Sequence, residues 1–106
     1  MSIEETIQDI DSAMGIAIRA KIKEDDVPSN WSRWFIIPVP GYVEASSFGP
    51  MPRREIQWLE IDPIEIKHIG RLVPPKSIDH TTDILQILDR ASIVSEIIEG
   101  RIRIAF

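Results

Sequence analysis

The C-terminal stretch IVSEIIEGRIRIAF, residues 93–106, decides the fold because its strand register can be worked out from the sequence. The dipeptide Glu99-Gly100 lies between alternating apolar residues, which predicts a two-residue hairpin turn. Counting outward from this turn gives five facing pairs, namely Ile98 with Arg101, Ile97 with Ile102, Glu96 with Arg103, Ser95 with Ile104, and Ile93 with Phe106. We therefore expect a terminal β-hairpin with one apolar face and one face that carries an opposite-charge pair.

Further strands are expected upstream of this hairpin. Isoleucine occurs 21 times and leucine four times, which favours a pleated sheet over a helix bundle. Residues 16–24 alternate between apolar and polar side chains, as a strand with one wet face does. Short strands are expected at 34–37 and 42–45, the second of them an edge strand within a proline-rich loop that spans 38–53. Residues 55–61 are apolar on both faces, which predicts a central strand.

Two helices complete the expected architecture. Ser2 and Glu5 form a capping box, and apolar residues then recur at helical spacing until Gly15, where the helix should end. A second helix with one apolar stripe is expected after Asp79, which serves as its N-cap. Residues 1–106 are thus predicted to form a single α+β domain. Its two helices pack on one face of a four- or five-stranded, mainly antiparallel sheet that ends in the C-terminal hairpin.

Charge and composition narrow the classes of partner. The net charge is −5, and residues 1–26 hold seven acidic but only three basic side chains. An acidic surface repels phosphate, so nucleic acid and anionic membranes are poor partners, and we expect a basic protein partner instead. The chain has no cysteine, which suits a reducing compartment. The acidic start MSIEET is unlike a secretory signal, so we expect a cytoplasmic protein.

The stretch IDPIEIKHIGR, residues 61–71, holds the sequence's Glu-x-x-His pair, Glu65 and His68. On a helix this spacing puts two metal ligands on one face, and His80 could supply a third. A metal site needs three or four ligands, however, and nothing in the sequence brings more of them together. We therefore predict no metal, no cofactor and no catalytic residue. A small metal-dependent enzyme or metal-binding domain that uses Glu65 and His68 is kept as an alternative.

Two backbone interpretations of this stretch are open. Asp62 at the N-cap, Pro63 at the first helical position and Gly70 beyond the end would make a short capped helix, and this interpretation is preferred. Residues 64–68 also alternate as a strand does. In a strand, the pair would point to opposite faces and the metal hypothesis would fail.

The stretch NWSRW, residues 30–34, is the predicted partner-binding surface. Tryptophan and arginine are the residues that most often carry the energy of an interface. An acidic run that follows the first strand would form a rim around this aromatic anchor. The alternative is that one or both tryptophans cap the core of the sheet. The predicted binding residues are Trp31, Arg33, Trp34, Glu24, Asp25 and Asp26.

About half of the chain resembles a group of small bacterial proteins. The resemblance rests on WLEIDP at 58–63, GRLVPPKSID at 70–79, the short amphipathic helix that follows, and EGRIRI at 99–104. These motifs resemble small uncharacterised bacterial proteins of the domain-of-unknown-function kind, some of which are similar to immunity proteins of toxin loci. The resemblance implies an α+β bacterial protein and transfers no catalytic residue.

These observations predict a non-enzymatic protein-binding domain. The specific hypothesis is a bacterial immunity or antitoxin-like inhibitor, whose acidic surface would speed its encounter with a basic partner. A second alternative, beside the metal-binding one, is a homo-oligomeric structural subunit in which an open sheet edge pairs with a second copy.

Overall fold

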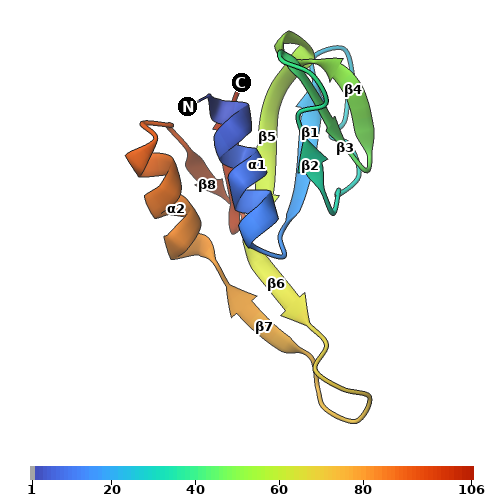
Figure 1. The fold of residues 1–106 in the computed structure, drawn as a ribbon, viewed down its shortest axis with the longest axis vertical. Coiled ribbons are helices and arrows are strands. Elements are labelled where there is room, and N and C mark those ends of the chain that lie inside the picture. The colour runs from blue at the N-terminus through green and yellow to red at the C-terminus, as the bar shows by residue number, and fades with distance from the viewer. Residues whose placement is uncertain (1) are drawn as a thin grey trace.

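The structure, a computed structural model, describes residues 2–106 as an α+β fold with three antiparallel sheets (Figure 1). The elements follow in chain order: α1 (Ile3–Ala13), β1 (Ala17–Ile22), β2 (Phe35–Ile36), β3 (Tyr42–Ala45), β4 (Phe48–Pro52), the 3-10 turn η1 (Arg53–Glu55), β5 (Ile56–Asp62), β6 (Ile64–Lys67), β7 (Lys76–Asp79), α2 (Thr81–Arg90), β8 (Glu96–Ile98) and β9 (Arg101–Ala105). The predicted fold class is confirmed.

The main sheet has four strands in the order β1-β5-β9-β8. The hairpin β8–β9 has the predicted register over three pairs, with Ile97 opposite Ile102 and Glu96 opposite Arg103. The predicted pairs Ser95–Ile104 and Ile93–Phe106 are wrong, because β8 begins only at Glu96 and the Ile93 amide bonds to the Leu88 carbonyl at the end of α2. Glu99 and Gly100 have φ angles of 51° and 79°, so both central residues of the turn are left-handed, as a type I′ hairpin requires. Strand β8 is the last strand in this order, so it forms one edge of the sheet.

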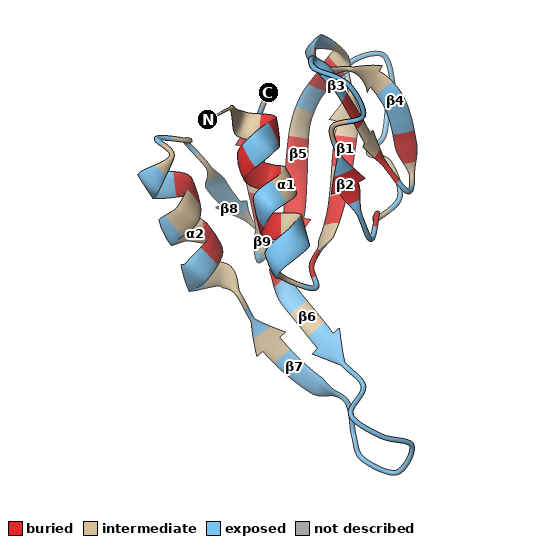
Figure 2. Cartoon of the chain, viewed as in Figure 1, coloured by how far each residue is buried: buried red, intermediate tan, exposed pale blue. Residues whose placement is uncertain are grey.

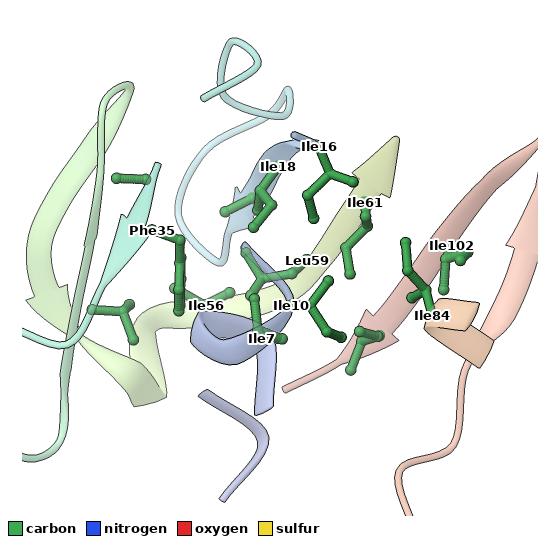
Figure 3. Packing of buried hydrophobic residues seen from close by; sticks show 14 of the residues in the cluster. Ile7, Ile10, Ile16, Ile18, Phe35, Ile56, Leu59, Ile61, Ile84 and Ile102 are labelled. Carbon is green, nitrogen blue, oxygen red and sulfur yellow. The ribbon is translucent and has the colours of Figure 1, made fainter. Parts of the chain in front are cut away.

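Both helices lie over one face of this sheet and bury their apolar stripes against it (Figures 1 and 2). The side chains of Ile7 and Ile10 from α1 and of Ile84 from α2 are fully buried, and they meet the inward residues of the strands (Figure 3). The small sheet β2-β3-β4 adds apolar side chains to the same core. Its buried members are Phe35, Val43, Ala45 and Phe48.

The two helices begin close to the predicted caps. The Ser2 hydroxyl accepts a hydrogen bond from the Glu5 amide at 3.2 Å, and α1 starts at the next residue, Ile3. Asp79 Oδ1 accepts a hydrogen bond from the Thr81 amide at 2.9 Å, although His80 occupies the N-cap position itself. The capping carboxylate therefore lies one residue before the formal start of α2.

Helix α2 ends in a Schellman motif. The Ile93 amide donates to the Leu88 carbonyl at 2.9 Å, and the Ser92 amide donates to the Asp89 carbonyl at 3.0 Å. Ser92 adopts a φ of 58°, in the place that glycine most often takes in this motif. The motif turns the chain directly towards β8.

The proline-rich region contains more regular structure than the sequence predicts. Strand β3 has the predicted bounds, but it lies between β2 and β4, so its assignment to an edge is wrong. Strand β4, Phe48–Pro52, falls within the predicted loop. Its prolines are tolerated because β4 is the outer strand of its sheet, where a missing amide breaks few ladder bonds.

The predicted capped helix after Asp62 is wrong. Asp62 Oδ1 does accept a hydrogen bond from the Ile64 amide at 3.1 Å, yet the chain continues as strand β6. That strand pairs with β7, with Ile64 opposite Asp79 and Ile66 opposite Ser77. The alternating isoleucines and the pairing partner together outweigh the capping residues, whose signals are purely local.

Residues 64–79 form an arm, comprising β6, β7 and the turn between them, that projects from the body along the longest axis of the molecule (Figure 1). Every residue from 66 to 77 is exposed (Figure 2). Among the described residues, no helix combines the length and apolarity needed to cross a membrane.

Candidate interaction surface

The base of the arm is fixed by a carboxylate that joins three segments. Glu65 Oε1 lies 2.8 Å from His80 Nε2, and both side chains are largely buried. The other carboxylate oxygen packs so closely on Gly15 that a Cβ at that position would overlap it. A hydrogen bond with His80 lowers the pKa of Glu65, and the Gly15 amide lowers it further. An ionised carboxylate only accepts, so the His80 Nε2 carries the proton in this pair.

Glu65 therefore meets His80 and not His68. The two residues of the Glu-x-x-His pair lie on or beside an extended strand, so the helical premise of the metal hypothesis is wrong. His68 is exposed beyond the end of β6. Within residues 2–106, no three side chains of His, Cys, Asp or Glu gather in a way that would hold a metal ion.

Trp31 covers the outer face of the main sheet, the face opposite the helices. The guanidinium carbon of Arg19 lies 4.7 Å from its ring centroid, and that of Arg101 lies 5.1 Å away. Such stacking is attractive because the ring face carries negative charge. Trp31 is consequently half-buried, and its side chain already has contacts within the chain.

The same face holds a buried ion cluster. Glu60 is 1% exposed, and its two carboxylate oxygens each receive one arginine. Arg19 places Nε and Nη2 2.7 Å from Oε1, and Arg103 places the same two atoms 3.0 and 2.9 Å from Oε2. Arg103 also stacks on Trp58 at 4.0 Å. These contacts explain how a carboxylate is buried in the centre of the sheet without a solvent partner.

The remaining predicted binding residues are accessible. Trp34 is 40% exposed, and Arg33 and the acidic run, Glu24, Asp25 and Asp26, are exposed as well. Of the two tryptophans, then, only Trp34 offers the free aromatic surface that an interface anchor needs.

The arm concentrates exposed apolar side chains on one projection. Ile66, Ile69 and Val73 are 55%, 63% and 53% exposed, and Leu72 at the tip is 98% exposed. Isolated exposed apolar residues are normal, but a contiguous group on a protruding hairpin is typical of an interaction site.

The tip of the arm is also basic. Residues 66–77 include Lys67, Arg71 and Lys76 and no acidic residue, within a chain whose net charge is −5. Lys67 and Lys76 lie directly opposite each other across the two strands. Like charges in such a pair destabilise a hairpin. The repulsion therefore lowers the stability of the arm slightly, and a nearby negative charge would offset it.

A hollow of about 550 Å³ lies at the other end of α2, between its last turns and the start of β8. Leu85, Ile93 and Val94 supply its apolar lining, and Asp89 supplies a carboxylate. Val94 is 88% exposed, and Ile97 on the adjoining edge strand is 55% exposed. Ser92 and Ser95 complete the lining, so this hollow combines apolar side chains with polar ones and one carboxylate.

Residues 4–105 match the family described as a family of unknown function, DUF6678. The chain belongs to this family. Membership confirms the resemblance to a domain of unknown function. The search of curated proteins and the search of solved structures each found no match for this DUF6678 chain.

The arm is the part of this DUF6678 protein that sequence reasoning missed. The signal was present in IGRLVPP, residues 69–75, where apolar residues surround a single arginine and two prolines. A loop of that composition inside a compact domain would be expected to pack its apolar side chains. Only the strand pairing of β6 with β7 reveals that they are held away from the body.

Proposed function

We propose that this DUF6678 protein is a non-enzymatic protein-binding domain whose binding element is the arm. The observation that carries the proposal is the 98% exposure of Leu72 at the tip of a hairpin whose flanking apolar residues are also exposed. Burying one such side chain in a partner contributes about 1.5–3 kcal/mol. The Glu65–His80 contact supports the proposal because it holds the base of the arm in one orientation, which reduces the ordering cost of binding.

The proposal extends to a bacterial immunity or antitoxin-like inhibitor that acts in the cytoplasm. Its support is the overall net charge of −5 and the exposed acidic run Glu24, Asp25 and Asp26, which follows the end of β1. This second surface suits a basic partner, since opposite charges accelerate encounter. The arm and the acidic run would then contact different parts of an assembly.

Tagged chain expressed at its natural level in the native host tests the proposal. We expect a protein partner to co-purify with the wild-type chain and to be lost from the double variant Leu72→Ser/Val73→Ser. Val27→Ser is the matched control, because Val27 is 68% exposed on a loop outside the arm. Equal recovery with the arm variant and the control would refute the proposal, as would a wild type that recovers neither another protein nor an untagged copy of the chain.

A further inference from the structure

The arm and the hollow are complementary in both chemistry and charge. Leu72 and Val94 are the two most exposed large apolar side chains among residues 2–106, at 98% and 88%. One is at the tip of the arm and the other borders the hollow. Each has a charged neighbour, and the two neighbours carry opposite charges: Arg71 precedes Leu72, and Asp89 lines the hollow with Val94. Contact between the two surfaces would therefore bury one exposed apolar residue from each of them.

The rest of the charge distribution agrees with this match. The arm tip holds three bases and no acid between residues 66 and 77. Glu96, on the edge strand next to the hollow, adds a second exposed carboxylate. The nearest base on α2, Arg90, instead lines a separate hollow that faces α1. Arg103 lies opposite Glu96 and is bound to Glu60, so Asp89 is the carboxylate of the hollow that is available to the basic arm.

An arm cannot reach the hollow of its own chain, because the two lie at opposite ends of α2. Strand β7 leads into the N-terminus of α2 (Figure 1). The hollow borders the C-terminal turn of the same helix. A two-fold axis perpendicular to the long axis would lay two copies side by side in opposite directions. Each arm tip would then meet the other copy's hollow, and the contact would close as a symmetric dimer.

We propose that the arm of this protein docks into the hollow of a second copy, so that two chains form a reciprocal arm-exchanged dimer. This inference rests on the proposed function, since it takes the arm as the binding element, and it names the partner as the chain itself. Leu72 enters the hollow against Leu85, Ile93 and Val94, and Arg71 pairs with Asp89. The like-charge pair of Lys67 and Lys76 gains negative neighbours from the partner's edge strand.

Light scattering and sedimentation of the purified full chain, from roughly 1 to 500 μM, test the inference. The expected mass is twice the 12.1 kDa of the chain. Leu72→Ser and Val94→Ser should each raise the dissociation constant roughly 10- to 100-fold, because each change removes two anchors from a symmetric dimer. Val27→Ser should leave it unchanged. All three positions are exposed, so unaltered thermal unfolding of the diluted monomers verifies that the variants fold.

A charge exchange identifies the docking partner of the arm. Arg71→Glu alone and Asp89→Arg alone should each weaken self-association, because both contacts of each homodimer become repulsive. Mixing the two variants should restore it. In the mixed dimer, one contact keeps the natural pair and the other holds the reversed pair, so both are attractive.

A wild-type chain that stays monomeric at 500 μM would overturn the inference, as would a dimer that neither Leu72→Ser nor Val94→Ser weakens. A monomer whose native partner is still lost in the Leu72→Ser/Val73→Ser variant refutes the second copy as occupant but leaves the binding role of the arm intact. If the wild type is monomeric and no partner depends on the arm, both proposals fall.

Discussion

Replacing Glu60 with glutamine should destabilise the protein far more than its small chemical change implies. The carboxylate is 1% exposed and accepts two contacts from Arg19 on one oxygen and two from Arg103 on the other. Glutamine offers one acceptor oxygen and one donor NH₂ group. It can therefore serve only one arginine, while the second guanidinium faces another donor.

The size of the effect follows from these contacts. Losing one hydrogen-bonded charge contact costs about 1.5–3 kcal/mol, and weakening the other from charged to neutral costs about 1 kcal/mol more. The arginine side chains are 26% and 28% exposed, so they recover part of this loss by turning towards water. We expect Glu60→Gln to lower the free energy of unfolding by about 2–4 kcal/mol, with a fall in Tm on the order of 10–20 °C.

Urea unfolding followed by tryptophan fluorescence measures this change, because Trp31 and Trp58 stack on the same arginines. Glu96→Gln is the matched control. Glu96 lies opposite Arg103 in the neighbouring strand but is exposed, so its loss should cost less than about 1 kcal/mol. If Glu60→Gln cost no more than Glu96→Gln, the cluster would contribute nothing beyond a surface ion pair and our reasoning would be wrong.

Three further predictions concern other sites. Gly15→Ala should push Glu65 away from His80 and raise the pKa of Glu65 towards its ordinary value, as a carbon NMR titration would show. In a Glu65→Ala background the added methyl group meets no carboxylate, so the same change should instead stabilise the folded protein by about 0.4–1 kcal/mol. Burial raises the pKa of Asp11, so the fold favours its protonated form and loses stability as the pH rises above the ordinary pKa. Asp11→Asn should therefore stabilise at neutral pH, with a gain that vanishes in acid; a gain that persisted in acid denaturation curves would contradict this cause. Ser92→Gly should stabilise by about 1 kcal/mol in thermal melts by relieving a left-handed φ of 58°, and Ser92→Ala should not.

Local signals predicted the local parts of the fold. The register of the C-terminal hairpin followed from its two-residue turn, and the start of α1 followed from Ser2, because both depend on residues close together in sequence. The stretch after Asp62 could not be decided that way. Its capping residues and its alternating isoleucines gave opposite answers, and the deciding partner, β7, lies beyond an exposed turn with two prolines.

The candidate site shows the same division. The sequence identified Trp31 and Trp34 as equivalent, but two arginines on different strands of the main sheet stack on the first and leave the second exposed. The sequence placed Glu60 in a strand but did not identify its arginine partners. Those partners are aligned by the strand order β1-β5-β9, which depends on contacts between residues far apart in the chain. The exposure of Leu72 could likewise not be predicted from the sequence, because it depends on the pairing of β6 with β7.

The way the arm joins the body has a consequence for how this family can diversify. The His80 amide donates to the Pro63 carbonyl at 2.9 Å, so the chain leaves and re-enters the body at adjacent points. A tight turn could bridge those points with little change in the entropy of chain closure. The exposed residues 66–77 lie between these points and exclude Glu65 and Asp79, which contact the body. We expect the length and sequence of these exposed residues to be changeable while the sheet and helices that fold the protein are left as they are.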